Sequence, residues 1–355
     1  MIEWRVQDRV ENCRPSRPFL LMFVRLSSLL LPARFIIPTA TKLNLHRRSM
    51  SLISGPPQDT ISPSTTRIGW IGTGVMGRSM CAHLISAGYS VTVFNRTPSK
   101  AHPLLQMGAH LADSPQSLAA SSHVVFTIVG YPSDVRSVIL SSSGVLSALP
   151  PSATVVDMTT SDPSLAVEIS AAAAARGCSA VDAPVSGGDR GAREGKLAIF
   201  AGGDEGVVRR LAPLFQCMGK VNYMGGAGLG QSAKLANQIT IASTMVGLVE
   251  GMIYAHKAGL DVKLYLEAIS AGAAGSKSLD LYGGRILRRD FEAGFFVHHF
   301  VKDLGICLME CQRMGWRCPG WPSHTSCMCR LWRMERVVWA PRPLFWLLSG
   351  LTIPN

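Results

Sequence analysis

Acidic residues are scarce in this chain, and its cysteines have no regular arrangement. The 355 residues include 23 Asp and Glu against 35 Lys and Arg, which gives a formal charge of +12 at pH 7. The nine cysteines form no CxxC pair and no regular framework, so a disulfide-stapled domain is not expected. Cys307 and Cys311 are one helical turn apart, and we expect them to be buried thiols in a protein of a reducing compartment.

The excess positive charge lies at the two ends of the chain. Residues 1–66 carry +5 and residues 315–355 carry +4, which leaves +3 for residues 67–314. Because the middle of the chain is almost balanced, no basic face is expected there. This distribution excludes a nucleic acid as the partner.

The N-terminal segment contains no acid between Glu11 and Asp59, an interval that holds seven Lys or Arg among Ser, Thr and Leu. A leader that is rich in arginine and hydroxyl groups and poor in acids is typical of a mitochondrial or plastid transit peptide. A secretory signal is the alternative, and Met22 could be the true start because three acids precede it. The apolar run within the leader is broken by an arginine and is too short to span a bilayer. We therefore predict that residues 1–66 are a transit peptide and linker, with the mitochondrion as destination and the plastid as alternative.

The folded part of the chain is organised around a glycine-rich turn. An apolar strand pattern opens at Ile68, glycines follow in GxGxxG spacing, and an amphipathic stretch covers residues 79–87. In a βα turn that binds a dinucleotide, the first glycine makes the tight turn, the second lets the backbone approach the pyrophosphate, and the third lets helix and strand pack closely. The alternative is a glycine-rich loop selected only for close packing. The cofactor-binding residues expected in this turn are Gly72, Thr73, Gly74, Val75, Met76 and Gly77.

Strand and helix patterns alternate after this turn. Three of the helix patterns begin with a capping residue followed by proline, which is the residue favoured at the first helical position. The expected strands are residues 90–94, 124–129, 154–158 and 179–183. This order predicts an α/β fold with a parallel, doubly wound sheet of the Rossmann type over residues 67–228.

The end of the second strand distinguishes between NAD and NADP as cofactor. An acid at this point would bind the ribose 2′-hydroxyl of NAD, whereas an arginine accommodates the 2′-phosphate of NADP. The sequence has Asn95, Arg96 and Thr97 here and no acid. These residues favour NADP(H). Alternatively, Arg96 only stacks on the adenine and either cofactor binds.

Three later loops carry further candidate residues, and two of them are expected at the same edge of the sheet because ligands gather at the carboxyl ends of strands. Two of them are assigned to the nicotinamide side by their order in the chain. The third is rich in glycine, and its successive backbone amides can form an anion-binding concavity for a substrate carboxylate. The alternative for this third loop is a tight connection to the next strand. The residues are Gly130, Tyr131 and Thr160 for the cofactor and Ser186, Gly187 and Gly188 for the substrate.

A long apolar segment, residues 231–258, contains almost no helix breaker. It is apolar on nearly every face, which indicates a buried helix or a membrane span, and Lys234, Asn237, Gln238 and Glu250 argue against the membrane. A buried lysine is costly, so Lys234 needs a partner or a function, and burial would lower its pKa into the range that suits proton transfer near neutral pH. The alternative is a surface lysine at a helix start.

Five motifs in this order resemble the β-hydroxyacid dehydrogenases, in particular the plant mitochondrial branch that is like 3-hydroxyisobutyrate dehydrogenase. The motifs are IGxGxMGxxM at 71–80, DAPVSGG at 182–188, GKLxIxxGG at 195–203, KLANQ at 234–238 and FxKDLG at 300–305. The resemblance covers residues 67–314. It implies a Rossmann-type domain followed by an all-helical domain, residues 229–314, with the active site between them.

The resemblance also implies roles for single residues. It places the catalytic lysine at Lys234, a substrate-orienting asparagine at Asn237, the carboxylate loop at Ser186, Gly187 and Gly188, a lysine near the nicotinamide at Lys302, and pocket-lining residues at Phe295 and Asp303. The implied reaction transfers a hydride between NAD or NADP and a small β-hydroxy acid. The namesake substrate is 3-hydroxyisobutyrate, which is oxidised to methylmalonate semialdehyde in valine breakdown. The alternative is an NADPH-dependent glyoxylate or succinic semialdehyde reductase. A homo-oligomer is expected for the intact family.

The sequence departs from the family pattern after Met314. Five of the seven tryptophans lie in the last 40 residues, and prolines interrupt any helical periodicity. Residues 315–322 can be encoded so that a shifted reading frame gives Leu-Ala-Leu-Pro-Gly-Leu-Ala, so we interpret residues 315–355 as a frameshifted or mis-spliced tail. A genuine tail would leave the helical domain incomplete and its apolar faces exposed, which puts the oligomer in doubt and makes a non-catalytic dinucleotide-binding product the alternative. A zinc site built from His324, Cys327 and Cys329 matches no established spacing and lacks a fourth ligand, so no metal is expected.

Overall fold

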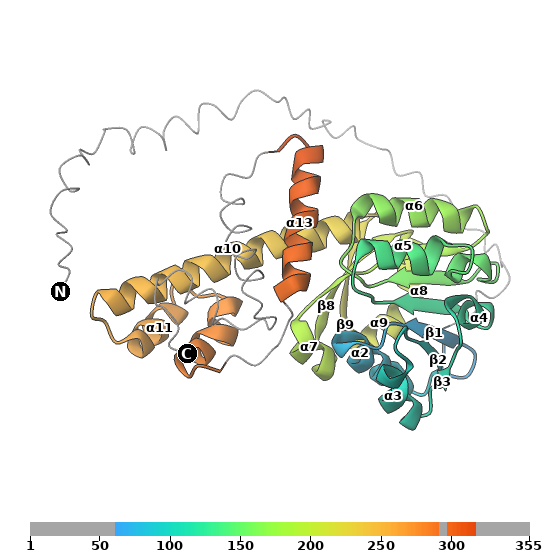
Figure 1. The fold of residues 1–355 in the computed structure, drawn as a ribbon, viewed down its shortest axis with the longest axis horizontal. Coiled ribbons are helices and arrows are strands. Elements are labelled where there is room, and N and C mark those ends of the chain that lie inside the picture. Colours follow the sequence, from blue (N-terminus) through green and yellow to red (C-terminus); the bar gives the residue numbers. More distant parts are fainter. Residues whose placement is uncertain (1–60, 291–296, 317–355) are drawn as a thin grey trace, which may run out of the picture. The chain divides into compact units, whose positions relative to one another are not determined.

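The computed structural model describes residues 61–290 and 297–316 (Figure 1). Strands and helices alternate from the first strand onward, as the sequence predicts. The first half contains β1 (Arg67–Ile71), α2 (Val75–Ser86), β2 (Ser90–Phe94), a 3₁₀ turn (Pro98–Ala101), α3 (His102–Gln106), β3 (His110–Leu111), α4 (Pro115–Ala120), β4 (Val124–Thr127), α5 (Pro132–Leu140), a second 3₁₀ turn (Val145–Ser147), β5 (Thr154–Asp157), α6 (Pro163–Ala174) and β6 (Ser179–Asp182).

The second half begins with short elements and ends with helices. It contains β7 (Val185–Ser186), α7 (Gly188–Glu194), β8 (Leu197–Gly203), α8 (Glu205–Arg210), α9 (Ala212–Met218), β9 (Gly219–Gly225), α10 (Leu229–Lys257), α11 (Val262–Ser270), the π-helical turn η3 (Leu279–Gly283), α12 (Gly284–Leu287) and α13 (Val297–Arg313). A Rossmann-type domain is therefore followed by a helical domain, and this predicted fold class is confirmed.

The sheet is parallel in its Rossmann part and mixed beyond it. Its order is β3-β2-β1-β4-β5-β6-β8-β7, with β9 paired to β8. All pairs from β3 to β6 are parallel, but β8 runs antiparallel to both β6 and β7. A parallel crossover needs about a dozen residues or more, and residues 187–196 between β7 and β8 are too few for it. The predicted parallel sheet is confirmed for β1, β2, β4, β5 and β6, and β8 adds an antiparallel neighbour at the edge of β6.

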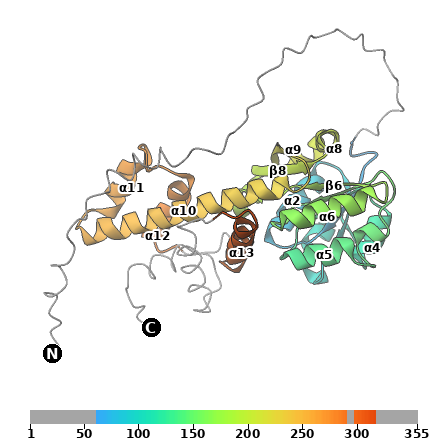
Figure 2. The same cartoon turned by 90° about the horizontal axis from the view of Figure 1, so that it is seen from above.

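Helices cover both faces of the sheet, and the core holds the glycine-rich turn in place. Figure 1 shows α5 and α6 on one side and α2 and α3 on the other, and Figure 2 shows the same layers from above. Trp70 of β1 is fully buried and stacks on Phe126 of β4 with 5.3 Å between the ring centroids. The indole nitrogen of Trp70 donates a hydrogen bond of 2.9 Å to the carbonyl oxygen of Gly72. Core packing and the turn that follows β1 are thus directly linked.

The 29-residue helix α10 is long and apolar enough to meet the length and composition criterion for a membrane span, a criterion that buried core helices also meet. One part of its surface packs into the core of the protein. It contacts β8, β9 and α13, and Met245, Val249 and Met252 on it are buried in one apolar cluster with residues of α11 and α13. Cys307 on α13 belongs to this cluster, and Cys311 is also buried, as expected.

Candidate active site

The glycine-rich turn between β1 and α2 has the geometry of a dinucleotide cradle. Gly72 has φ +98°, a conformation that L side chains rarely adopt, and a Cβ atom there would overlap the carbonyl of Ile128. A Cβ at Gly77 would overlap the carbonyl of Gly72, so the third glycine permits the close packing of α2. At Gly74 no atom lies within 4 Å of the Cβ position. The first and third glycines are required by packing, whereas the second faces open space that a pyrophosphate can approach.

Asn95, at the end of β2, connects this turn to the neighbouring strand. Its side-chain oxygen accepts a hydrogen bond of 3.0 Å from the amide of Thr73, and its amide group donates one of 2.8 Å to the carbonyl of Thr97. Thr73 is 3% exposed, and its hydroxyl has no hydrogen-bond partner in the described part of the chain. The side chain of Asn95, which was predicted to lie near the adenine ribose, thus fixes the backbone of the turn.

Two cations lie at the end of the cleft where a cofactor 2′-phosphate is expected. Arg96 is 86% exposed and forms an ion pair of 3.2 Å with Asp134. Lys100, which was not among the predicted site residues, also lines the cleft. Because an exposed ion pair contributes little free energy, Arg96 can exchange Asp134 for a phosphate. The donor set at this position therefore fits NADP, and the glycine turn fits the shared part of NAD and NADP.

A single cleft of about 690 Å³ runs from the glycine turn to the helical domain. It brings together most of the residues that the sequence analysis named. Those that line it are Gly72, Gly74, Val75, Met76, Gly77, Asn95, Arg96, Thr97, Gly130, Tyr131, Thr160, Ser186, Gly187, Gly188, Lys234, Lys302 and Asp303. Thr73 and Asn237 are not among the lining residues, and Phe295 lies outside the described part of the chain.

Lys234 lies on α10 and is only 6% exposed, so the alternative of a surface lysine does not hold. Burial lowers the pKa of its amine to about 8, the carboxylate of Asp303 raises that pKa, and the neighbouring charge of Lys302 lowers it. The Nζ atom donates a hydrogen bond of 3.0 Å to the side-chain oxygen of Gln238, one turn further along the helix. The result is an amine that changes its charge near neutral pH at the wall of the cleft.

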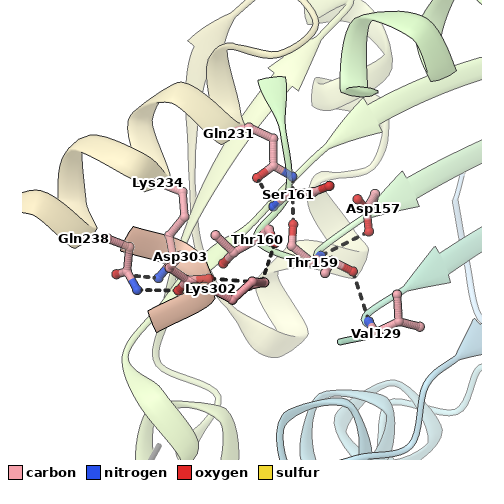
Figure 3. Close-up of polar contacts among 10 residues, drawn as sticks. All are labelled: Val129, Asp157, Thr159, Thr160, Ser161, Gln231, Lys234, Gln238, Lys302 and Asp303. Carbon is pink, nitrogen blue, oxygen red and sulfur yellow. Dashed lines mark hydrogen bonds and ion pairs between the residues drawn. The ribbon is translucent and has the colours of Figure 1, made fainter. Parts of the chain in front are cut away.

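Gln238 connects this amine to α13, as Figure 3 shows. Its side-chain nitrogen donates a hydrogen bond of 2.6 Å to Asp303, and its oxygen also accepts one of 2.9 Å from Asn237. Lys302 lies 3.0 Å from the other oxygen of Asp303 and donates a hydrogen bond of 2.6 Å to the carbonyl of Thr160. Gln238, rather than Asn237, therefore occupies the cleft wall beside Lys234.

The ends of β4 and β5 are joined beside the cleft. Asp157 is buried, and its Oδ1 atom accepts hydrogen bonds of 2.8 Å from Thr127 and 3.1 Å from the amide of Thr159. Desolvation raises the pKa of Asp157 to about 6, although these hydrogen bonds lower it. The hydroxyl of Thr159 accepts a 3.0 Å hydrogen bond from the amide of Val129. This arrangement holds the loops that carry Gly130 and Thr160 beside each other.

Sequence reasoning missed several aromatic side chains of the cleft, among them His299 and Tyr282. His299 lines it and lies 5.9 Å from the ring of Tyr131, and desolvation together with neighbouring positive charge lowers the pKa of His299 to about 4. Tyr282 lines it from the π-helical turn, and burial raises its pKa to about 12. The helical spacing of three residues from His299 to Lys302 could have identified the histidine. No periodicity marks a residue on a π-helical turn.

The described residues contain no group of three or more His, Cys, Asp or Glu side chains that could bind a metal ion. The tail residues His324, Cys327 and Cys329 lie outside them.

Comparison with known proteins agrees with this geometry. Residues 67–226 match the family model described as the NAD binding domain of 6-phosphogluconate dehydrogenase. Residues 228–331 match the model described as the NAD-binding domain of NADP-dependent 3-hydroxyisobutyrate dehydrogenase. An Arabidopsis thaliana protein named 3-hydroxyisobutyrate dehydrogenase-like 1, mitochondrial, is 68% identical over 292 residues, which are 82% of this chain and 87% of the relative. The chain belongs to the β-hydroxyacid dehydrogenase family.

Solved structures related to this β-hydroxyacid dehydrogenase share its fold. The 3-hydroxyisobutyrate dehydrogenase of Mycobacterium tuberculosis, solved with L-serine, is 28% identical with a TM-score of 0.73, covering 80% of this chain and 99% of that one. A protein named Psf3, solved with NADP+ and 2-OPP, is 25% identical with a TM-score of 0.73, covering 79% and 100%. The protein is therefore an NAD(P)-dependent oxidoreductase of hydroxy acids.

Proposed function

We propose that the protein transfers a hydride between NADP(H) and a short β-hydroxy acid, with 3-hydroxyisobutyrate and methylmalonate semialdehyde as the reacting pair. The observation that carries this proposal is the position of Lys234, a buried amine in the same cleft as the glycine cradle and the loop of Ser186, Gly187 and Gly188. The 68% identity to a protein named after 3-hydroxyisobutyrate supports the choice of acid.

Lys234 moves the proton in this proposal. The bound nicotinamide supplies or accepts the hydride. In the direction of oxidation the neutral amine of Lys234 takes the proton of the substrate hydroxyl, and in the direction of reduction the ammonium returns it. A pKa of about 8 suits both tasks, because a proton-transfer group works best when its pKa lies near the working pH.

The remaining site residues bind and orient the substrate and the cofactor. The loop of Ser186, Gly187 and Gly188 holds the substrate carboxylate with its hydroxyl and backbone amides. Two of its members, Gly187 at φ +133° and Gly188 at φ +63°, have conformations that favour glycine. Asn237 acts on the substrate side through its hydrogen bond to Gln238. Asp303 completes the pocket, and Lys302 supports the nicotinamide side through Thr160. Phe295, which the family resemblance assigns to the same pocket, lies outside the described residues.

The cations Arg96 and Lys100 at the cofactor end of the cleft fit the reductase alternative equally well, because both functions use NADP(H). Steady-state kinetics of the full chain distinguish the two functions. The proposal expects the highest kcat/KM for 3-hydroxyisobutyrate with NADP+. Higher kcat/KM values for glyoxylate or succinic semialdehyde with NADPH would establish the reductase instead. Binding of cofactor without turnover of any of these acids would indicate a non-catalytic protein.

We further propose a mitochondrial location, which the leader composition and the name of the Arabidopsis relative support. Residues 1–66 would serve as transit peptide and linker, residues 67–228 as nucleotide-binding domain and residues 229–314 as helical domain. A fluorescent protein fused after residue 66 tests the location, with plastid or secretory fluorescence as the contrary results.

A further inference from the structure

Gln231 lies in the first turn of α10 and is completely buried, although it is not among the residues that line the cleft. Its side-chain nitrogen donates a hydrogen bond of 2.7 Å to the carbonyl of Thr159, and its side-chain oxygen accepts one of 2.9 Å from the amide of Ser161. Figure 3 shows this amide beside the loop after β5. Both polar groups of the Gln231 side chain thus form hydrogen bonds with one loop of the nucleotide-binding domain, residues 159–161.

The backbone of Gln231 is fixed as well. Its amide donates a hydrogen bond of 2.8 Å to Asp182 of β6, and the amide of Gly228 donates one of 2.8 Å to the other oxygen of the same carboxylate. A carboxylate at this position also complements the positive end of a long helix. The start of α10 is therefore fixed against the sheet from two directions.

Gln231 connects the loop of residues 159–161 with α10. In the proposed reaction, this loop carries a residue of the nicotinamide side and α10 carries the amine that moves the proton. Thr160, between the two loop residues bonded to Gln231, lines the cleft on the nicotinamide side, and its carbonyl binds Lys302. Lys234 follows Gln231 by three residues, so the two side chains lie on one face of α10. A shift of the Gln231 side-chain amide would therefore move Lys234 relative to Thr160.

We propose that Gln231 is a positioning residue, whose side-chain amide sets the placement of Lys234 relative to the loop of residues 159–161. The inference rests on the role of Lys234 in the proposed function. Misplacement of a reacting group by about 1 Å can cost about 100-fold in rate. A side chain outside the cleft thereby controls the rate of proton transfer inside it.

The isosteric variant Gln231→Glu separates this role from a merely structural one. A protonated carboxyl donates to the carbonyl of Thr159 and accepts from the amide of Ser161, as the amide does, whereas the ionised form cannot donate. The titratable groups on α10, on the strand ends that Gln231 contacts and on α13, which packs against α10, include Asp157, Asp162, Asp182, Lys234, Lys302, Asp303 and Glu310. The geometry predicts that kcat of the variant approaches the wild-type value at low pH and falls as the new carboxyl ionises.

The experiment uses the full chain as wild type, Gln231→Glu, Gln231→Leu and Leu214→Ala. Leu214 is buried on α9 outside the cleft, so its truncation controls for lost stability. We expect Gln231→Leu to lower kcat about 100-fold with an unchanged Kd for NADPH, and Leu214→Ala to lower only the melting temperature. In the protein without cofactor, hydrogen exchange at the amide of Ser161 is expected to accelerate in Gln231→Leu and not in Leu214→Ala.

Three results would overturn the inference: Gln231→Leu keeps its kcat, Gln231→Glu has the pH profile of the wild type, or the exchange at Ser161 is unchanged. Lys234→Met, measured in parallel, separates this failure from that of the proposed function. If Lys234→Met retains turnover, the proposed role of the amine fails. If Lys234→Met is inactive while Gln231→Leu is fully active, only the role of Gln231 fails.

Discussion

Gln238 on α10 donates a hydrogen bond of 2.6 Å to Asp303 on α13. A carboxylate can only accept, so this contact requires the nitrogen of the Gln238 amide to face Asp303 and its oxygen to face Lys234. The orientation of the amide beside the reacting amine is therefore determined by a residue of another helix. In the family pattern Asp303 lines the pocket, and here its charge also raises the pKa of Lys234 against the larger lowering effect of burial.

The charge of Asp303 can be removed with little change of shape by Asp303→Asn. The carboxylate raises the pKa of Lys234, so its loss should lower that pKa below about 8. The pH at which the oxidation rate is half-maximal is then expected to move to lower values. Initial-rate measurements over a pH series test this shift. A half-maximal pH that is unchanged or higher than in the wild type would contradict the electrostatic role of Asp303.

Arg96 is expected to discriminate between the two cofactors. Hydrogen bonds to charged groups contribute about 1.5–3 kcal/mol, so Arg96→Ala should raise KM for NADPH by about 10-fold or more and leave KM for NADH nearly unchanged. The matched control is Arg136→Ala, which removes another exposed arginine that is paired with Glu168 and does not line the cleft. Equal effects on both cofactors would indicate that Arg96 only stacks on the adenine.

Asp157 should make stability depend on pH between about 4 and 6. Its folded-state pKa is raised to about 6 from 3.8, so the folded protein binds the proton more tightly than the unfolded chain. The stabilisation that the protonated form adds to the free energy of unfolding is complete below pH 4 and is lost as the pH rises through 6. The free energy of unfolding falls by about 3 kcal/mol over this range.

Asp157→Asn keeps the oxygen that accepts from Thr127 and Thr159 and removes the titration. Chemical denaturation from pH 4 to pH 7 should therefore show a smaller fall in unfolding free energy for this variant than for the wild type. The exposed Asp113→Asn serves as control and should follow the wild type. An unaltered slope in Asp157→Asn would contradict the account of Asp157.

The tail after Met314 provides a fourth test. If residues 315–355 result from a shifted reading frame, the transcript across codon 315 should contain a frame that continues the helical domain. A protein with the restored frame should then melt at a higher temperature than the chain as given, because apolar faces of the helical domain would be covered. An intact transcript that encodes the tail as written would refute the frameshift.

Much of the fold could be predicted because its signals are local. The glycine spacing after β1 and the apolar run of α10 were sufficient to place the cradle and the long helix. The burial of Lys234 was left open by the sequence, since a lysine at the start of an apolar helix can also lie at the surface. The antiparallel direction of β8 relative to β6 could not be predicted, because it depends on which strands pair in the folded sheet and a local apolar pattern does not specify its partner.

The cleft was harder to predict than the fold, because tertiary packing decides which helical side chains face it. Asn237 and Gln238 are adjacent on α10, and helical spacing places both near Lys234. The contact with Asp303 from α13 brings Gln238 to the cleft wall. The contacts of Gln231 could not be predicted from the sequence either, because its partners Thr159 and Ser161 are some 70 residues away in the chain.

The most direct test of the central claim is the pH dependence of turnover in Lys234→Met, with Lys257→Met at the exposed end of the same helix as control. For the wild type and the control, the account predicts an oxidation rate that rises with pH through about 8 and a reduction rate that falls over the same range. For Lys234→Met it predicts a kcat lower by about 100-fold to 10,000-fold, no ionisation near 8 and an unchanged Kd for NADPH. A variant with near-normal kcat and the wild-type pH profile would contradict the claim that Lys234 transfers the proton.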